Sequence, residues 1–133
     1  MSVIADSTKA GVNELATLLA DMNKESGFLL AVLTDWQGLP IASAAAPDQD
    51  PDAQSAVVAL VQKTAAQIHD QLGMAQTDEI WMYDASGQRL VCRPFNAKER
   101  DMILAVLVPD GRQSYRRRTN KAVNAIRRTL LKS

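Results

Sequence analysis

Two short runs of this chain are apolar at every position and end at a polar turn, whereas most of its other apolar residues recur at helical spacing. The first run covers residues 28–33 and the second covers residues 102–108. A strand without polar alternation is usually buried on both faces, and the shortness of these runs and the polar turns after them disfavour helices. We therefore expect both runs to form central strands of a sheet that is covered on both sides.

An Asp-x-x-Gly turn follows the first central strand, at residues 35–38. Asp35 can accept hydrogen bonds from the backbone just ahead of it, and Gly38 can adopt a positive φ without a Cβ clash. The pattern resumes as a weaker strand at residues 39–43, where Pro40 has no N–H to donate to a sheet. We expect a hairpin whose second strand lies at an edge.

A second hairpin is predicted later in the chain. Residues 79–83 and 89–93 are rich in aromatic and β-branched side chains, and they flank a loop at residues 84–88 that contains a glycine. This arrangement is typical of two antiparallel strands joined by a short turn. Residues 94–100 then form a predicted polar connection to the second central strand.

The first and last segments have apolar residues at spacings of three and four, which is typical of helices. The first helix is predicted over residues 6–24, with Asp6 or Ser7 as its N-cap and Gly27 as its stop signal. The last helix is predicted from Ser114 almost to the end. Its apolar stripe comprises Tyr115, Thr119, Ala122, Val123, Ile126 and Leu130.

A middle helix is predicted over residues 53–72, with Asp52 as its cap and Gly73 as its C-terminal signal. Alanine fills much of its circumference, and Lys63 and Asp70 are its only charged residues. A helix without a broad polar face is expected to pack on the sheet with one side and to contact a binding partner with another side. The simplest partner is a second copy, although an Ala-rich helix that tolerates exposure remains an alternative.

The predicted order is helix, two strands, helix, three strands, helix. Two central strands that are buried on both faces, with three helices to cover them, indicate a three-layer α/β sandwich of the α+β type around a mainly antiparallel five-stranded sheet. The chain has 133 residues, which leaves no room for a second core. We therefore expect one domain over residues 1–133.

The formal net charge of zero hides a strong separation of charge. Residues 112–133 carry eight Lys or Arg and no Asp or Glu. The other 111 residues carry seven Lys or Arg and fifteen Asp or Glu, a net charge of −8. Such separation can attract an acidic partner, a membrane surface or nucleic acid to the basic segment. The basic residues can equally form the solvated face of a terminal helix.

Several functional classes are disfavoured by the composition. The longest apolar runs are far shorter than the roughly 20 residues that cross a bilayer, and no leader pattern is recognisable, so we expect a cytoplasmic protein without a transmembrane segment. Cys92 is the only cysteine, which excludes an intrachain disulfide and favours a small core residue on a strand.

The inventory of catalytic and ligand-binding residues is small. His69 is the only histidine, and the six glycines form neither of the common phosphate-binding loops. Asp48, Asp50 and Asp52 are spaced as in the start of an EF-hand loop, but the required Gly and Glu further along are absent. We expect no metal, no cofactor and no catalytic residue.

The pattern as a whole resembles the roadblock family, also called the dynein light chain LC7 type, over about residues 8–131. The resemblance is carried by the element order, by the D-x-x-G-x-x-I hairpin at residues 35–41, and by the Ala-rich helix that ends before Leu72-Gly73. It implies a homodimer, or a heterodimer with a related subunit, in which the middle helices pack together and edge strands join into one sheet. It also implies binding of small Ras-like GTPases, as a scaffold or as an activator of GTP hydrolysis, without chemistry of its own.

These considerations give two sets of candidate residues. The expected dimer-interface residues are Ala56, Val57, Leu60, Lys63, Thr64, Ile80, Trp81, Met82 and Tyr83. The expected partner-binding residues are Arg89, Arg93, Arg116 and Arg117. An arginine inserted into a GTPase site could by type be Arg89, Arg93 or Arg100, although a solvated surface position is the better interpretation of each.

Three functions follow in order of preference. The first is a non-catalytic dimeric regulator or scaffold that binds a small Ras-like GTPase. The second is a module that binds nucleic acid or another anionic surface through the basic C-terminal helix, but the lack of aromatic residues after Tyr115 disfavours nucleic acid. The third is a structural subunit of a multi-chain roadblock scaffold.

Overall fold

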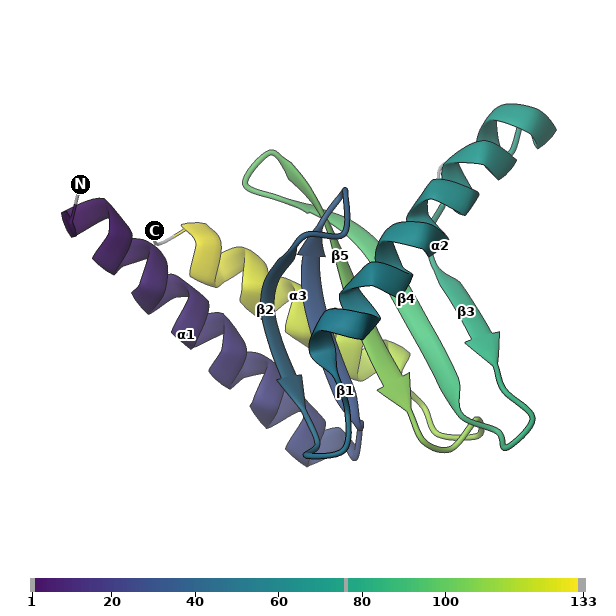
Figure 1. The fold of residues 1–133 in the computed structure, drawn as a ribbon, viewed down its shortest axis with the longest axis horizontal. Coiled ribbons are helices and arrows are strands. Elements are labelled where there is room, and N and C mark those ends of the chain that lie inside the picture. The colour runs from purple at the N-terminus through teal and green to yellow at the C-terminus, as the bar shows by residue number, and fades with distance from the viewer. Residues whose placement is uncertain (1, 76, 132–133) are drawn as a thin grey trace.

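The computed structural model describes residues 2–75 and 77–131, with side chains from residue 11 onward. The elements follow the predicted order of helix, two strands, helix, three strands and helix (Figure 1). They are α1 (Ser2–Ser26), β1 (Leu30–Asp35), β2 (Pro40–Ala45), α2 (Pro51–Leu72), β3 (Ile80–Tyr83), β4 (Arg89–Ala97), β5 (Arg100–Val108) and α3 (Arg116–Leu131).

The five strands form one antiparallel sheet in the order β2-β1-β5-β4-β3. Residues 30–33 of the first apolar run belong to β1, and the whole second run, 102–108, belongs to β5; the two strands lie side by side in the interior of the sheet. The prediction of two central strands is therefore confirmed. The weaker strand after the Asp-x-x-Gly turn, β2, lies at one edge as predicted, and β3 lies at the other.

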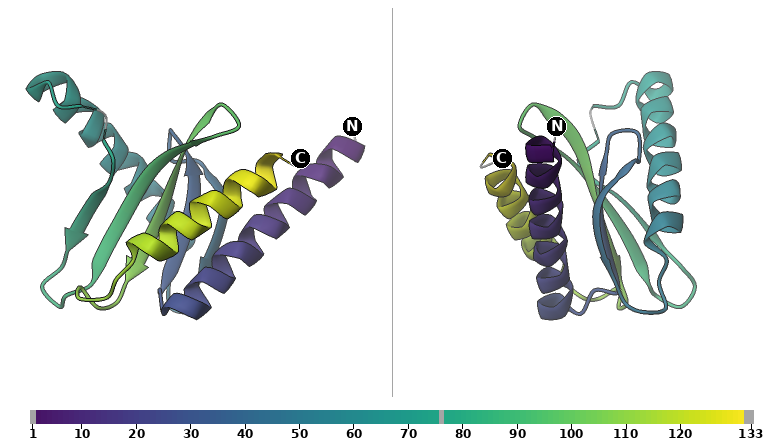
Figure 2. Two further views of the ribbon diagram at one scale, coloured as in Figure 1. Left: turned by 180° about the vertical axis from the view of Figure 1, so that it is seen from behind. Right: turned by 60° about the vertical axis from the view of Figure 1, so that its left-hand side comes forward.

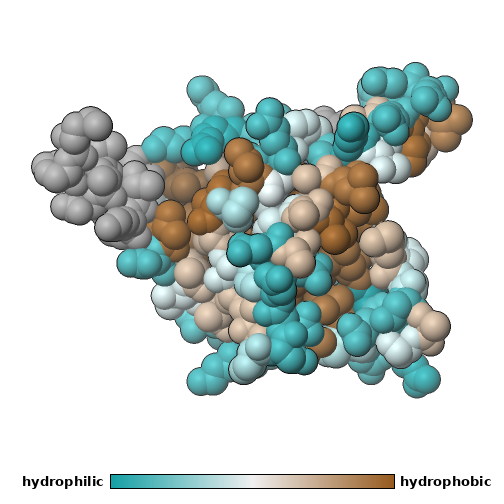
Figure 3. Space-filling model, viewed as in Figure 1, coloured by the Kyte–Doolittle hydropathy of each residue, from teal (hydrophilic) through white to brown (hydrophobic). Residues whose placement is uncertain are grey.

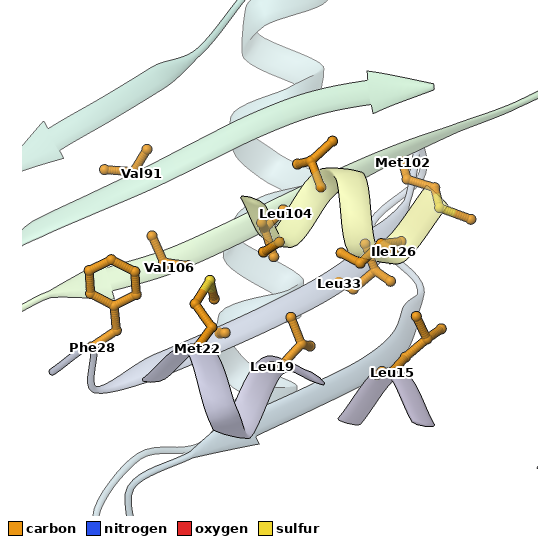
Figure 4. Close-up of a cluster of buried hydrophobic side chains, with 14 of the residues drawn as sticks. Leu15, Leu19, Met22, Phe28, Leu33, Val91, Met102, Leu104, Val106 and Ile126 are labelled. Atoms are coloured by element: carbon orange, nitrogen blue, oxygen red, sulfur yellow. The ribbon is translucent and has the colours of Figure 1, made fainter. Parts of the chain in front are cut away.

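The sheet is the middle of three layers, because α1 and α3 cover one face and α2 covers the other (Figure 2). In the larger core, Leu15 and Leu19 of α1 pack with Leu33, Leu104 and Ile126 (Figure 4). Alternate residues of a strand point to opposite faces. The unbroken apolar runs thus supply both cores at once, as the three-layer prediction requires.

The smaller core lies between the sheet and α2. It contains Val58, Leu90, Cys92, Ile103 and Ala105. Burial raises the pKa of the Cys92 thiol to about 12. The single cysteine is therefore a core residue on a strand, as predicted, and it remains a neutral thiol at neutral pH.

The β1–β2 turn is organised by Asp35 and pressed against α2. A side-chain oxygen of Asp35 accepts hydrogen bonds from the N–H groups of Gln37 and Leu39, each 2.9 Å long. Gly38 has a φ of +87° and lies against Ala59. A Cβ at position 38 would lie 2.3 Å from the Ala59 Cβ and 2.8 Å from its Cα. The turn and the helix therefore fit together only with glycine at this position.

The N-cap predictions are wrong by a few residues. No Gly or Pro separates residues 2–5 from the predicted first helix, so α1 begins at Ser2 and includes Asp6 and Ser7. In α2 the cap is Asp50 rather than Asp52, because Pro51 is well suited to the first helical position. The predicted end of α2 is confirmed, since a left-handed Gly73 donates its N–H to the His69 carbonyl.

The predicted polar connection at residues 94–100 is wrong, because β4 continues to Ala97 and β5 begins at Arg100. Only Lys98 and Glu99 remain as a turn, with φ values of +53° and +63°. Such tight hairpins usually contain Asn or Gly at these positions, so the sequence carries no turn signal here. Pro94 is tolerated because it lies beyond the end of β3, where β4 has only one neighbouring strand.

The two sheet edges differ. Along β2, Pro40 has no N–H to donate, and the Ala44 carbonyl accepts a hydrogen bond of 3.1 Å from the Asn23 side chain of α1. This helix packs along β2. At the other edge, β3 is a four-residue strand whose residues Trp81, Met82 and Tyr83 are exposed. The edge formed by β3 is therefore the more open of the two.

Candidate functional site

An apolar groove lies on the surface between α2 and β3. Its volume is about 680 Å³. Figure 3 shows hydrophobic side chains gathered between these two elements, where the second half of α2 extends beyond the sheet. Its apolar lining comprises Val57, Leu60, Val61, Ala65, Ile68, Met74, Ala75, Ile80 and Met82.

The groove exposes side chains that would be costly to leave in water. Leu60 is 65% exposed, and Ile68 and Met74 are also large exposed apolar residues. Ile68 is exposed because α2 extends beyond the sheet while its apolar residues continue into its last turns, and Met74 lies just after the end of the helix. Contiguous apolar surface of this kind is typical of protein interaction sites.

The structure brings together five of the nine predicted interface residues: Val57, Leu60, Thr64, Ile80 and Met82. Ala56 and Lys63 are exposed on α2 but do not line the groove. Trp81 and Tyr83 alternate with the groove residues of β3 and stack edge to face, with ring centroids 4.9 Å apart. The role of all nine residues in an interface stays a prediction.

Sequence reasoning missed part of the groove lining. Val61 and Ile68 belong to the apolar stripe of the predicted middle helix, so that stripe could have identified them. Met74 and residues 77–79 belong to the connection from α2 to β3, which has no regular pattern. Their position depends on how the chain returns to the sheet, and no sequence signal reports this.

A polar cluster joins the start of β3 to α3. The Glu79 carboxylate accepts a hydrogen bond from the Tyr115 hydroxyl and one of 2.7 Å from Arg116. The same guanidinium donates to Asp78 at 3.0 Å. The Glu79 side chain is only 14% exposed, whereas those of Arg116 and Asp78 are 51% and 76% exposed, so only the Glu79 end of the cluster is shielded from water. The cluster therefore fixes the segment that borders the groove.

Two of the predicted partner-binding arginines make hydrogen bonds within the protein itself. Arg89 is buried, donates to the Gln113 carbonyl at 2.6 Å, and lies over the Tyr115 ring with its guanidinium carbon 4.6 Å from the centroid. Arg93 donates to Thr119 at 2.8 Å, and its side chain is 13% exposed. Burial, and then the nearby positive charge of Arg116, lower the pKa of Arg93. The interpretation of Arg89 and Arg93 as solvated surface residues is therefore wrong.

The other candidate arginines are more exposed to solvent than Arg89 and Arg93. Arg116 is exposed but paired with Asp78 and Glu79, whereas Arg117 is exposed without a hydrogen bond or ion pair in the described part of the chain. Arg100 is exposed at the start of β5. Among the four partner-binding candidates, Arg117 is therefore the one that is both exposed and unpaired within the described residues.

The polar cluster predicts a pH dependence of stability. Burial, followed by the hydrogen bond to Glu79 and its negative charge, raises the pKa of Tyr115 above its ordinary value of 10.0. Folded Tyr115 therefore keeps its proton at a pH at which the unfolded chain releases it. The resulting stability is complete below about pH 10 and is lost as the pH rises through the raised pKa of the folded state.

This dependence can be measured by urea unfolding at about pH 8 and about pH 11. We expect the free energy of unfolding to fall more between these values in the wild type than in Tyr115→Phe, which has no titrating hydroxyl. Glu79→Gln should give a fall between the two, because the charge beside the hydroxyl is removed. Equal falls in all three proteins would contradict the assignment.

Within residues 2–75 and 77–131, no group of three or more His, Cys, Asp and Glu side chains is arranged to hold a metal ion. The exposed His69 has its Nδ1 atom 3.3 Å from a carboxylate oxygen of Asp70. None of the helices described is long and apolar enough to span a membrane. The groove and the basic residues of α3 are therefore the surface features that a function has to explain.

No family model matches the sequence, and neither does any curated protein. Solved structures do match. The gliding protein MglB from Thermus thermophilus is 21% identical, with a TM-score of 0.71 over 93% of each chain. MglB from Myxococcus xanthus is 18% identical, with a TM-score of 0.70 over 91% of this chain and 90% of that one. A roadblock/LC7 domain from Streptomyces avermitilis is 17% identical, with a TM-score of 0.68 over 87% and 97%. The chain therefore has the fold of the roadblock/LC7 domains.

Proposed function

We propose that this chain is a non-catalytic regulator or scaffold that self-associates and binds a small Ras-like GTPase. The observation that carries the proposal is the apolar groove between α2 and β3. The class of partner is supported by the resemblance to roadblock proteins and by the fold that the chain shares with MglB.

A second copy of the chain is a suitable partner for α2 and β3, the two elements that border the groove. The unpaired backbone groups of β3 can extend the sheet by pairing with the same strand of a symmetry mate. The neighbouring helix α2 presents exposed small residues such as Ala56 and Ala66, which allow another helix to approach closely. Both features belong to adjacent elements, so one twofold axis can use them together.

The role toward a GTPase is binding and positioning rather than chemistry by this chain. Arg89 and Arg93 are engaged within the domain, so neither is free to enter a nucleotide site. Arg100, the third arginine considered for insertion, is exposed, so any stimulation of GTP hydrolysis would act through Arg100 or by holding the GTPase's own switch loops in place.

The proposal is tested in two steps. Light scattering at micromolar concentration, at low and high salt, should give the mass of a dimer in both conditions, because an apolar interface is little affected by screening. Pull-down of small Ras-like GTPases from the same genome, loaded with GDP or with a GTP analogue, should then give a complex. A monomer in the first step would contradict self-association, and no complex with any of these GTPases would contradict the second part.

A further inference from the structure

The segment from Arg112 to the end of helix α3 contains seven basic residues and no acidic residue, and the cations of the helix fall on different sides. On the side toward the sheet edge, Arg116 pairs with Asp78 and Glu79. Arg127 is also engaged, because its Nε donates to the Asn96 carbonyl at 3.0 Å. These two positive charges are held by the domain itself.

The side of α3 that faces α1 is also neutralised. A carboxylate oxygen of Glu25 lies 3.7 Å from the guanidinium of Arg118 and 4.0 Å from the ammonium of Lys121. A hollow between the two helices is lined by these residues and by Asp21. The charges of this side are therefore largely balanced by α1.

The outward side of α3 is different. It carries Arg117, Asn124 and Arg128, with Lys121 at its border toward α1, opposite the buried stripe that includes Thr119 and Ile126. Arg117 and Arg128 are eleven residues apart, which is about three turns, so they share one face at a separation of roughly 16 Å. Both are exposed, and within the described residues neither makes a hydrogen bond or an ion pair. We call Arg117, Asn124 and Arg128 the α3 outer stripe.

The charge of α1 limits what can approach the outer stripe. Asp21 and Glu25 line the hollow beside α3, and the exposed Glu14 lies on the same face of α1, seven residues before Asp21. Packed helices lie about 8–10 Å apart, which is close to the Debye length at physiological salt. A flat anionic membrane or a DNA duplex laid on this layer would therefore meet carboxylates as well as arginines.

We propose that the α3 outer stripe docks a narrow acidic segment of a partner protein, with carboxylates that reach Arg117 and Arg128. A helix or an extended strand that follows α3 can place its carboxylates on Arg117 and Arg128, and meets the α1 carboxylates only near Lys121, which Glu25 approaches to 4.0 Å. The inference goes beyond the proposed function. It concerns the face of the sheet opposite the α2–β3 groove, and it does not depend on whether the partner is a GTPase.

The probe for this site is a fluorescently labelled Glu-Ala repeat peptide, followed by anisotropy at low and physiological salt. We expect Arg117→Gln/Arg128→Gln to weaken its binding about tenfold at low salt, as the loss of two exposed charge contacts predicts. The control Lys24→Gln/Lys63→Gln removes the same charge from exposed positions on other helices and should bind as the wild type does. Thermal unfolding should be unchanged in both variants.

Three results would overturn the inference. The first is peptide binding that is unaffected by the loss of Arg117 and Arg128, and the second is an equal loss in the control. The third is binding of phosphatidylserine vesicles or of duplex DNA that exceeds peptide binding and requires the same two arginines, since this would identify a broad anionic surface as the ligand. None of these results bears on self-association, which light scattering tests separately.

Discussion

Replacement of Gly38 by alanine is expected to destabilise the domain by roughly 2 to 5 kcal/mol. A left-handed backbone costs a non-glycine residue about 1 to 2 kcal/mol, and overpacking of a tight contact costs about 1 to 3 kcal/mol. The added methyl group would lie 2.3 Å from the Ala59 Cβ, so the turn and α2 would have to separate. Small domains have only about 5 to 15 kcal/mol of stability in total. Urea unfolding should therefore show a large loss, or no folded protein.

Gly73→Ala is the matched control. Gly73 also has a positive φ, +67°, but a Cβ there would meet nothing within 4 Å. It should cost only the backbone part, about 1 to 2 kcal/mol. The double variant Gly38→Ala/Ala59→Gly should recover only part of the loss, because the Cα of residue 59 would still be 2.8 Å away. Equal losses in Gly38→Ala and Gly73→Ala would show that the contact with α2 is unimportant.

Leu60→Glu is expected to weaken self-association by at least about 100-fold. This factor corresponds to about 3 kcal/mol, the scale of burying a charge without a partner. Leu60 lines the groove and is 65% exposed in the single chain, so a glutamate there should leave the fold intact. Sedimentation over a concentration series should show a monomer where the wild type is a dimer. Circular dichroism should show the same helix and strand content.

The control for this variant is Asn13→Glu, which adds the same charge at an exposed position of α1 on the opposite side of the sheet. It should dimerise as the wild type does. Loss of association in both variants would point to net charge rather than to the groove. An unchanged dimer in Leu60→Glu would place the interface elsewhere.

Much of the fold could be predicted from local patterns. The unbroken apolar runs identified β1 and β5, since burial on both faces removes the usual alternation. The turn at Asp35 and the stop at Gly73 were predictable because each depends on the chemistry of one or two neighbouring residues. For the same reason the sequence identified the face of α2 that carries Val57 and Leu60.

The features that could not be predicted depend on residues far apart in the chain. Arg89 and Arg93 were expected in solvent, but Tyr115, Thr119 and the Gln113 carbonyl are brought to them only by folding. The Lys98-Glu99 turn was missed because a strong register between β4 and β5 imposes left-handed backbone on residues that do not signal it. Such outcomes follow from tertiary context, which overrides local preference.

The difference between the two sheet edges limits how many copies of the chain can join into one sheet. If two copies join through β3, the ends of the combined sheet are the two β2 strands. Pro40 lacks a donor there, and the Ala44 carbonyl is already bonded to Asn23. A third copy would therefore find no comparable edge to extend. Pairing through β3 would then end in a closed, finite particle, and the same chain would resist fibre formation even at high concentration.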